Sequence, residues 1–245
     1  MKPQLCISKH PRSFCMLMTD PRIIVAIDKF DFEKANTILE QLNPDLCLVK
    51  IGSVVFNALG KSFLKHASSR GFKIFLDLKL HDIPNTVYET IIGLSDCKID
   101  MLTVHLSGGE EMLSKAMLAG KSINTKVIGV SMLTSLEEKD SLSLFGNKLE
   151  DQISNLFKIA VKVNIDGIVC SPHELNIANA ILDSNAIKVT PGIRDIKVED
   201  DQARTMSAKE AIERGSTFLV IGRPITQAED IGQALQNFNN SIYEK

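Results

Sequence analysis

The chain has 245 residues, of which 44% are hydrophobic, so it can bury a large core. Its 28 basic and 30 acidic residues leave a net charge of -2 and form no basic stripe, so no nucleic-acid partner is expected. The longest apolar runs, such as residues 23–27, have the length of a strand and are too short to span a membrane.

Apolar runs of strand length alternate with amphipathic stretches of helical length along the chain. The apolar runs predict strands near residues 22–28, 46–51, 73–79, 100–106, 126–132, 166–170, 187–190 and 217–221. The amphipathic stretches predict helices near residues 31–43, 53–70, 85–96, 108–121, 150–163, 173–183, 207–214 and 228–241. Asp31, Ser107 and Ser171 are expected to cap the N-termini of three of these helices.

The order of these elements predicts the fold class. Continuous apolar strands such as residues 23–27 are typical of a parallel sheet that is buried on both faces. Eight strand–helix units without a Gly/Pro/Ser-rich linker favour one closed (β/α)8 TIM barrel, an α/β fold, over residues 21–245. An open doubly wound sheet is the alternative, because periodicity alone does not show that a sheet closes.

The first twenty residues differ from the rest of the chain. They carry Lys2, Lys9, His10 and Arg12 and lack a compact apolar region with a cleavage site, which argues against a signal peptide. We expect residues 1–20 to form a poorly ordered extension. The five cysteines are scattered and form no C-x-x-C pair, which fits a reducing cytoplasm. Cys47 and Cys170 lie in apolar strand patterns, so we expect them to be small core residues.

Residues 75–86, Phe-Leu-Asp-Leu-Lys-Leu-His-Asp-Ile-Pro-Asn-Thr, gather charges at the end of a predicted strand. Leucines alternate with polar residues there, so Asp77 and Lys79 should project from the same face. Asp82 follows just before a turn at Pro84. Charges of this kind are costly to bury unless they pair. A structural salt bridge and a catalytic acid–base cluster are both open interpretations.

Polar residues recur at the C-terminal ends of the predicted strands, the face where barrel enzymes keep their sites. These residues are Asp28, Lys50, Asp77, Lys79, His105, Ser171, Gly192 and Gly222. Lys50 stands between two apolar residues of its strand, so in a barrel wall it needs an anionic partner. This partner is either a structural carboxylate or part of a binding site.

The end of the eighth predicted strand, Gly222-Arg223, suggests a phosphate site. Glycine allows a ligand close to the backbone, and arginine can bind phosphate oxygens bidentately. Barrels often hold phosphate after strands seven and eight, and Pro191-Gly192 ends the seventh. The plain alternative is a turn glycine with a solvated arginine. The polar segment 194–204 is expected to be either a lid or a surface loop.

No metal and no nucleotide cofactor are expected. His105 is isolated at its strand end, and the pair His81-Asp82 does not make a metal cage. A lone histidine in such a place is more often hydrogen-bonded structure than a ligand. The chain also has no G-x-G-x-x-G motif and no P-loop.

The string at residues 77–86, Asp-Leu-Lys-Leu-His-Asp-Ile-Pro-Asn-Thr, resembles the signature of the orotidine 5'-phosphate decarboxylase family. The resemblance runs from about Ile23 to about Gln233. Other matching pieces are Val-Ala-Ile-Asp at 25–28, Val-Lys-Ile-Gly at 49–52, Thr-Pro-Gly-Ile-Arg at 190–194, Asp-Gln at 201–202 and Ile-Gly-Arg-Pro at 221–224. The resemblance implies conversion of orotidine 5'-phosphate to UMP and carbon dioxide without a cofactor, as the last step of UMP synthesis.

The resemblance also implies roles for single residues. Lys79 would stabilise the carbanion at C6 of the pyrimidine and protonate it, while Asp77 holds Lys79. Lys50 would contact the ribose and hold Asp77, and Asp28 would bind a ribose hydroxyl. The expected catalytic residues are Lys79, Asp77, Asp82 and Lys50. The expected substrate-binding residues are Asp28, Lys50, Asp77, Thr86, Thr134, Pro191, Arg194, Gln202, Gly222 and Arg223.

Three of these assignments concern the edges of the site. A hydroxyl near Thr134 would fix the pyrimidine, although a helix cap or a turn is the plain alternative for Thr134 or Ser135. Gln202 would be a second phosphate contact. Asp82 and Thr86 would reach into the site of a second copy, which implies a homodimer with shared sites. The alternative is that Asp82 caps the following helix of its own chain.

Two other functions stay open. Related sugar-phosphate decarboxylases and aldolases use a similar D-x-K-x-x-D pattern with a divalent metal, and here residues 83–86 and Gln202 argue against that reaction. The second alternative is a phosphate-ligand binder without catalysis. Lys79 argues against a binder, because simple binding does not need an acid–base–acid set.

Overall fold

The computed structural model describes residues 21–194 and 206–243. The expected extension at residues 1–20 and the expected phosphate contact Gln202 lie outside the described residues. Eight parallel strands form a closed barrel in sequence order. They are β1 (Ile23–Ile27), β2 (Cys47–Gly52), β3 (Ile74–Leu80), β4 (Met101–His105), β5 (Lys126–Val130), β6 (Gly167–Val169), β7 (Ile187–Thr190) and β8 (Phe218–Ile221).

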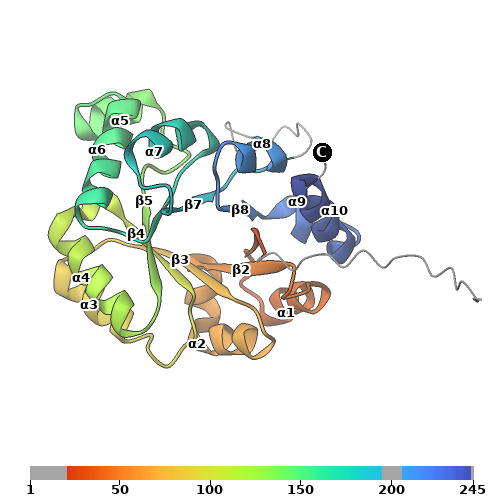
Figure 1. Cartoon of the computed structure of the whole chain (residues 1–245). Helices are drawn as coiled ribbons and strands as arrows, with labels where there is room; N and C mark the ends of the chain where they lie inside the picture. Colours follow the sequence, from red (N-terminus) through yellow and green to blue (C-terminus); the bar gives the residue numbers. More distant parts are fainter. Residues whose placement is uncertain (1–20, 195–205, 244–245) are drawn as a thin grey trace, which may run out of the picture.

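Helices connect successive strands and surround the barrel (Figure 1). The α-helices are α1 (Phe32–Gln41), α2 (Ser53–Ser69), α3 (Pro84–Ile92), α4 (Gly109–Ser122), α5 (Glu138–Phe145), α6 (Leu149–Lys162), α7 (Leu175–Ile181), α8 (Ala208–Glu213), α9 (Arg223–Thr226) and α10 (Ile231–Tyr243). Two short 3-10 helices, η1 (Leu106–Gly108) and η2 (Pro172–Glu174), precede α4 and α7. None of the helices in the described ranges is long and apolar enough to cross a membrane.

The sheet closes because β1 pairs with two neighbours. Ile24 of β1 is in register with Leu48 of β2 on one side and with Val220 of β8 on the other. The predicted (β/α)8 TIM barrel is therefore confirmed, and the alternative of an open doubly wound sheet is wrong. Each of the eight predicted strands and eight predicted helices is present, with ends displaced by a few residues.

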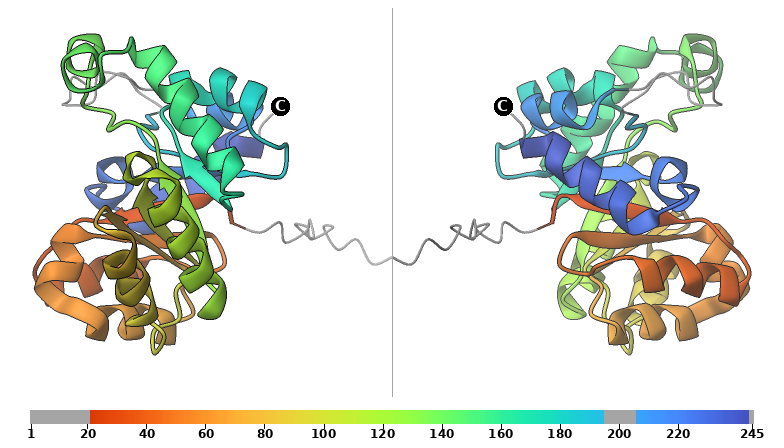
Figure 2. Two further views of the ribbon diagram at one scale, coloured as in Figure 1. Left: turned by 90° about the vertical axis from the view of Figure 1, so that its left-hand side faces the viewer. Right: turned by 90° about the vertical axis from the view of Figure 1, so that its right-hand side faces the viewer.

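The sequence prediction missed α5 and α9. Helix α5 has eight residues, and Ser141 is the buried one, so it lacks the apolar stripe that marks the other helices. In Figure 2, α5 (in green) stands at the edge of the molecule, beyond the other helices. Helix α9 has only four residues, which is too short to show a period.

Two of the three predicted helix caps are confirmed. The Asp31 side chain accepts a hydrogen bond from the Lys34 backbone N–H at 3.0 Å, and Ser171 caps η2. The prediction for Ser107 is wrong, since Gly108 is the residue that precedes α4. The Ser107 hydroxyl is instead 2.6 Å from Nδ1 of His105.

The barrel interior has an apolar layer directly beneath the site. Its buried residues are Ile24, Leu48, Phe75, Met101, Ile128 and Val189. Since strand side chains alternate, the next inward positions lie two residues further along each strand. On β2, β3 and β4 these positions are Lys50, Asp77 and Thr103. The fold thus places three polar side chains in adjacent strands on an apolar floor.

The opposite faces of the strands pack against the helices in a second, larger core. Cys47 and Cys170 are buried free thiols, as expected for small core residues. Burial raises the pKa of the Cys47 thiol to about 12. These thiols are therefore packing groups and not nucleophiles.

Candidate active site

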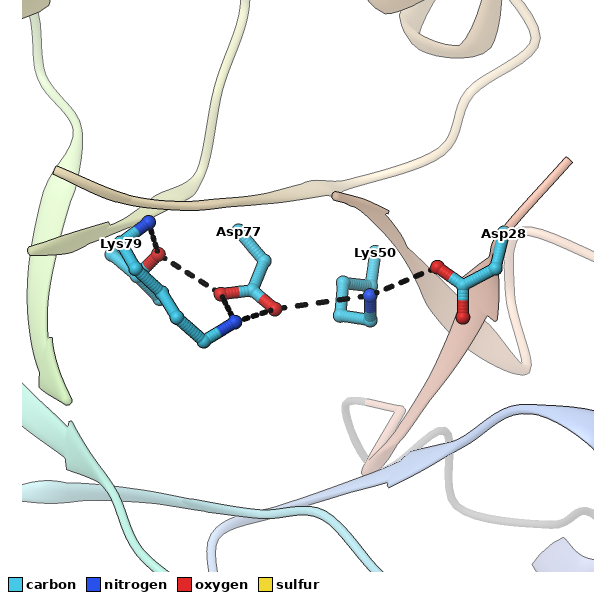
Figure 3. A network of polar contacts seen from close by, with 5 residues as sticks. Asp28, Lys50, Asp77 and Lys79 are labelled. Atoms are coloured by element: carbon cyan, nitrogen blue, oxygen red, sulfur yellow. Dashed lines mark hydrogen bonds and ion pairs between the residues drawn. The ribbon is translucent and has the colours of Figure 1, made fainter. Parts of the chain in front are cut away.

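A row of alternating charges crosses the C-terminal end of the barrel from β1 to β3 (Figure 3). Nζ of Lys50 lies 3.2 Å from Oδ1 of Asp28 and 3.7 Å from Oδ2 of Asp77. Nζ of Lys79 lies 2.9 Å from each carboxylate oxygen of Asp77. The anionic partner expected for Lys50 is thus present on both sides, and Asp77 joins the two lysines.

Burial makes this row more than a surface salt bridge. The side chains of Lys50 and Asp77 are only 14% and 12% exposed, whereas Lys79 is 38% exposed. Ions with so little water around them interact strongly, and removing one leaves its partner unpaired. Lys79 is the more exposed of the two lysines, so it is better placed than Lys50 to meet a ligand.

The backbone of β3 departs from regular strand geometry at this point. Lys79 has φ = +50°, a left-handed conformation that is uncommon for residues other than glycine. The register between β3 and β4 shifts between Leu76 and Leu80. Asp77 and Lys79 do meet, as the alternation predicted, but through an irregular strand. Strained backbone of this kind is concentrated at functional sites.

Thr103 on β4 belongs to the same network and was missed in the sequence. Its hydroxyl donates a hydrogen bond to Oδ1 of Asp77 at 3.0 Å and accepts one from the backbone N–H of Lys79 at 2.8 Å. The sequence does show that Thr103 lies two residues after Met101, on the inward side of the predicted strand, but it does not show that Thr103 lies opposite β3. A single threonine inside an apolar strand does not stand out without the register of the sheet.

Two cavities open beside the charged row. A cavity of about 230 Å³ is bordered by Asp77, Lys79 and Thr134. A second, of about 450 Å³, has the following residues among its lining: Asp28, Gly192, Arg194, Gly222 and Arg223. Lys50 and Pro191 line both cavities. A ligand with a flat ring at one end and an anion at the other could span them.

The loop after β5 contributes a hydroxyl-bearing wall. Thr134 and Ser135 both line the smaller cavity. The next helix, α5, begins at Glu138 and is capped by Glu137, so the alternative that Thr134 or Ser135 caps a helix is wrong.

Asp82 and Thr86 do not join this network within the described chain. Both are exposed, and the Asp82 carboxylate accepts a hydrogen bond from the Ile83 backbone N–H at 2.6 Å. Ile83 itself precedes α3, and no side chain caps that helix. The alternative that Asp82 caps α3 is therefore wrong. Its carboxylate faces outward, where a second copy of the chain could reach it.

His105 is hydrogen-bonded structure, as its isolation in the sequence suggested. Besides the contact of its Nδ1 with Ser107, its ring stacks on His81 with centroids 5.4 Å apart. Burial, followed by the charges of His81 and Lys79, lowers the pKa of His105 from its usual 6.5. Across residues 21–194 and 206–243 no group of three or more His, Cys, Asp or Glu is arranged to hold a metal ion.

Paired charges and joined cavities at the C-terminal face of a (β/α)8 barrel define a barrel enzyme site. Residues 21–238 match the Orotidine 5'-phosphate decarboxylase / HUMPS family, so the chain belongs to this family. An orotidine 5'-phosphate decarboxylase from Coxiella burnetii (strain RSA 331 / Henzerling II) is 39% identical over 229 residues, which cover 91% of this chain and 97% of the relative.

Two further relatives agree with this assignment. An orotidine 5'-phosphate decarboxylase from Legionella pneumophila (strain Corby) is 42% identical over 215 residues, covering 86% of this chain and 94% of the relative. The crystal structure of orotidine 5'-phosphate decarboxylase from Lactobacillus acidophilus matches with a TM-score of 0.81 and 34% identity, covering 92% of this chain and all 100% of that one.

The lowered pKa of His105 gives a testable pH dependence. The folded protein holds a proton on this ring less well than the unfolded chain does. His105 therefore favours the folded state above pH 6.5, and this contribution is lost as the pH falls from 6.5 through the folded-state pKa. An NMR titration of the ring protons should give a midpoint for His105 below 6.5. A midpoint at or above 6.5 would contradict the burial argument.

Proposed function

We propose that this protein decarboxylates orotidine 5'-phosphate to UMP and carbon dioxide, the last step of de novo UMP synthesis. One observation carries the proposal. In a chain of this family, the row Asp28–Lys50–Asp77–Lys79 lies along two neighbouring cavities. The larger is polar and cationic, and the smaller is bordered by Asp77 and Lys79.

The two cavities fit the two ends of a pyrimidine nucleotide. The ring would enter the smaller cavity, with Thr134 beside its polar edge. The phosphate would lie in the larger cavity against Gly222, Arg223 and Arg194. The ribose would lie between them, over Lys50 and Asp28, which already form an ion pair.

The chemistry follows from the position of Lys79. When the bond from C6 to the carboxylate breaks, its electron pair stays on C6, which has no adjacent carbonyl to accept it. The ammonium of Lys79 stabilises this charge and then donates a proton to C6, and the neutral lysine regains a proton from solvent. Carbon dioxide leaves as a neutral molecule. The mechanism uses no metal and no organic cofactor.

Asp77 holds the proton donor in place. Both of its oxygens accept from Nζ of Lys79, so the ammonium has a defined position before substrate arrives. Contacts to phosphate and ribose are remote from the bond that breaks. Their binding energy can offset the cost of placing the substrate carboxylate near Asp77.

We further propose a homodimer with shared sites. Asp82 and Thr86 are exposed and unattached to the charged row of their own chain, although they follow it closely in sequence. A two-fold interface that covers them would place each pair at the site of the other copy. We place the enzyme in the cytoplasm, where the thiols of Cys47, Cys97 and Cys170 would stay reduced.

The test of the proposal is loss of orotidine 5'-phosphate absorbance on adding the protein, with and without a chelator. Turnover that is unchanged by chelator supports the cofactor-free reaction. Activity on sugar phosphates that the chelator abolishes would instead support a metal-dependent reaction on the same barrel. Tight binding of UMP without turnover would support a binder.

Lys79→Ala should lower kcat by about five decades, because it removes a charge stabiliser and a proton donor that are each worth roughly two decades or more. The fold should persist, as judged by circular dichroism. Lys126→Ala is the matched control, since Lys126 is exposed at the opposite end of the barrel, at the start of β5. Near-normal turnover in a folded Lys79→Ala protein would rule out the mechanism.

Arg223→Ala should weaken binding of UMP by about 10- to 100-fold, the usual size of a lost charge-assisted hydrogen bond. Binding of uridine, which has no phosphate, should change less than about twofold. Arg70→Ala is the control, because Arg70 is paired with Glu40 on the outer surface. Equal losses for UMP and uridine in a calorimetric titration would show that Arg223 does not hold the phosphate.

Asp82→Ala and Lys79→Ala proteins should each be nearly inactive alone. On mixing, heterodimers should regain one intact site, which takes Lys79 from one chain and Asp82 from the other. Half of the sites in each heterodimer are then intact. Heterodimers verified by tag affinity that show no gain over the separate variants would refute the shared site.

A further inference from the structure

Strand β3 has a β-bulge, in which three of its residues lie opposite a single residue of β4. Leu76 pairs with Leu102, and Leu80 pairs with Val104. Four residue steps on β3 therefore match two steps on β4, so Asp77, Leu78 and Lys79 all face Thr103. Over these three residues the bulge interrupts the backbone ladder between β3 and β4.

The Thr103 hydroxyl supplies an acceptor for the Lys79 N–H inside the bulge. It accepts from the Lys79 N–H at 2.8 Å and lies 3.0 Å from Oδ1 of Asp77. A hydroxyl has one hydrogen and a carboxylate can only accept, so that hydrogen is directed to Asp77. Thr103 is fully buried, so water does not compete for either bond.

These bonds close a ring through both proposed catalytic groups. The Lys79 backbone donates to Thr103, Thr103 donates to Asp77, and Asp77 accepts from Nζ of Lys79 at 2.9 Å. The left-handed backbone of Lys79, with φ = +50°, is part of this ring. One hydroxyl thus holds the main chain of the lysine and the side chain of its partner at the same time.

We propose that Thr103 is the positioning residue that sets where the Lys79 ammonium and the Asp77 carboxylate stand relative to the substrate. It is not among the residues that line the smaller cavity, so it acts through these two groups and not by touching the ring. This inference rests on the proposed decarboxylation. It adds that the Thr103 hydroxyl affects kcat far more than it affects the affinity for substrate.

Thr103→Val keeps the shape of the side chain and removes both hydrogen bonds. We expect kcat to fall by about 10- to 100-fold, the usual effect of a displacement of about 1 Å at a reacting centre. The Kd for UMP should change less than about threefold, since the phosphate contacts are intact. Thr103→Ser keeps the hydroxyl and should hold kcat within about threefold of the wild type.

The matched control is Thr125→Val. Thr125 is also a buried threonine, and its hydroxyl donates to the carbonyl of Ile99 at 2.9 Å. It lies next to the start of β5, at the other end of the barrel. This variant should lose thermal stability as Thr103→Val does while keeping kcat. Equal kcat values for the two valine variants would show that Thr103 is merely structural and overturn the proposal.

A second pair of variants covers the case in which Thr103→Val does not fold. Thr103→Ala and Thr103→Ser both remove the γ-methyl group, and they differ from each other only in the hydroxyl. The alanine variant should show the loss of kcat, and its Lys79 amide hydrogen should exchange faster than in the serine variant. Equal kcat and equal exchange in this pair would also overturn the proposal.

The outcomes separate the two claims. A wild-type protein without turnover of orotidine 5'-phosphate would overturn the proposed function, and with it the role of Thr103 in that reaction. Turnover by the wild type together with unchanged kcat in Thr103→Val would overturn the positioning role alone.

Discussion

The Asp77 carboxylate is the point on which the site depends. It accepts from Nζ of Lys79, accepts from the Thr103 hydroxyl and lies 3.7 Å from Nζ of Lys50. A largely buried carboxylate is costly unless its lone pairs are satisfied, and here three strands supply the partners. Its loss would remove the ion-pair partner of Lys79 and leave Lys50 paired with Asp28. One acid thus couples Lys79, the proposed proton donor, to Lys50, at the proposed ribose end of the site.

The barrel provides this arrangement through the two-residue period of its strands. The apolar residues Leu48, Phe75 and Met101 fill the interior, and the next inward positions bring Lys50, Asp77 and Thr103 together above them. Closure of the sheet fixes neighbouring strands side by side, so charges far apart in sequence become neighbours. Among the described residues, every fully buried side-chain nitrogen and oxygen has a hydrogen-bond partner. The polar layer therefore sits in the core without an unsatisfied group.

Periodicity predicted the eight strands and favoured a barrel, because strands of a parallel sheet that is buried on both faces are continuous apolar runs. It did not distinguish a closed barrel from an open doubly wound sheet, since closure depends on the pairing of β1 with β8. Alternation within β3 also predicted that Asp77 and Lys79 would meet. It could not predict the bulge at Lys79, since a left-handed residue inside a strand goes with the register shift between β3 and β4 and does not follow from local propensity. Helix α5 was also missed. It is short and largely exposed, so its sequence has no apolar stripe with a helical period.

The charges of the row suggest why Asp82 stands apart. Asp28 and Asp77 balance Lys50 and Lys79, so the row is neutral within one chain and stable without a ligand. Under the proposed mechanism, the substrate adds a carboxylate next to Lys79, and a second copy would add Asp82. Loss of carbon dioxide removes a full negative charge from the ring substituent and leaves the electron pair at C6, where Lys79 can neutralise it by proton transfer. A further acid held beside the row on the same chain would give the empty row a net negative charge. In the proposed dimer, Asp82 would come from the partner, so each row would be balanced within its own chain and the third acid would join it only on association.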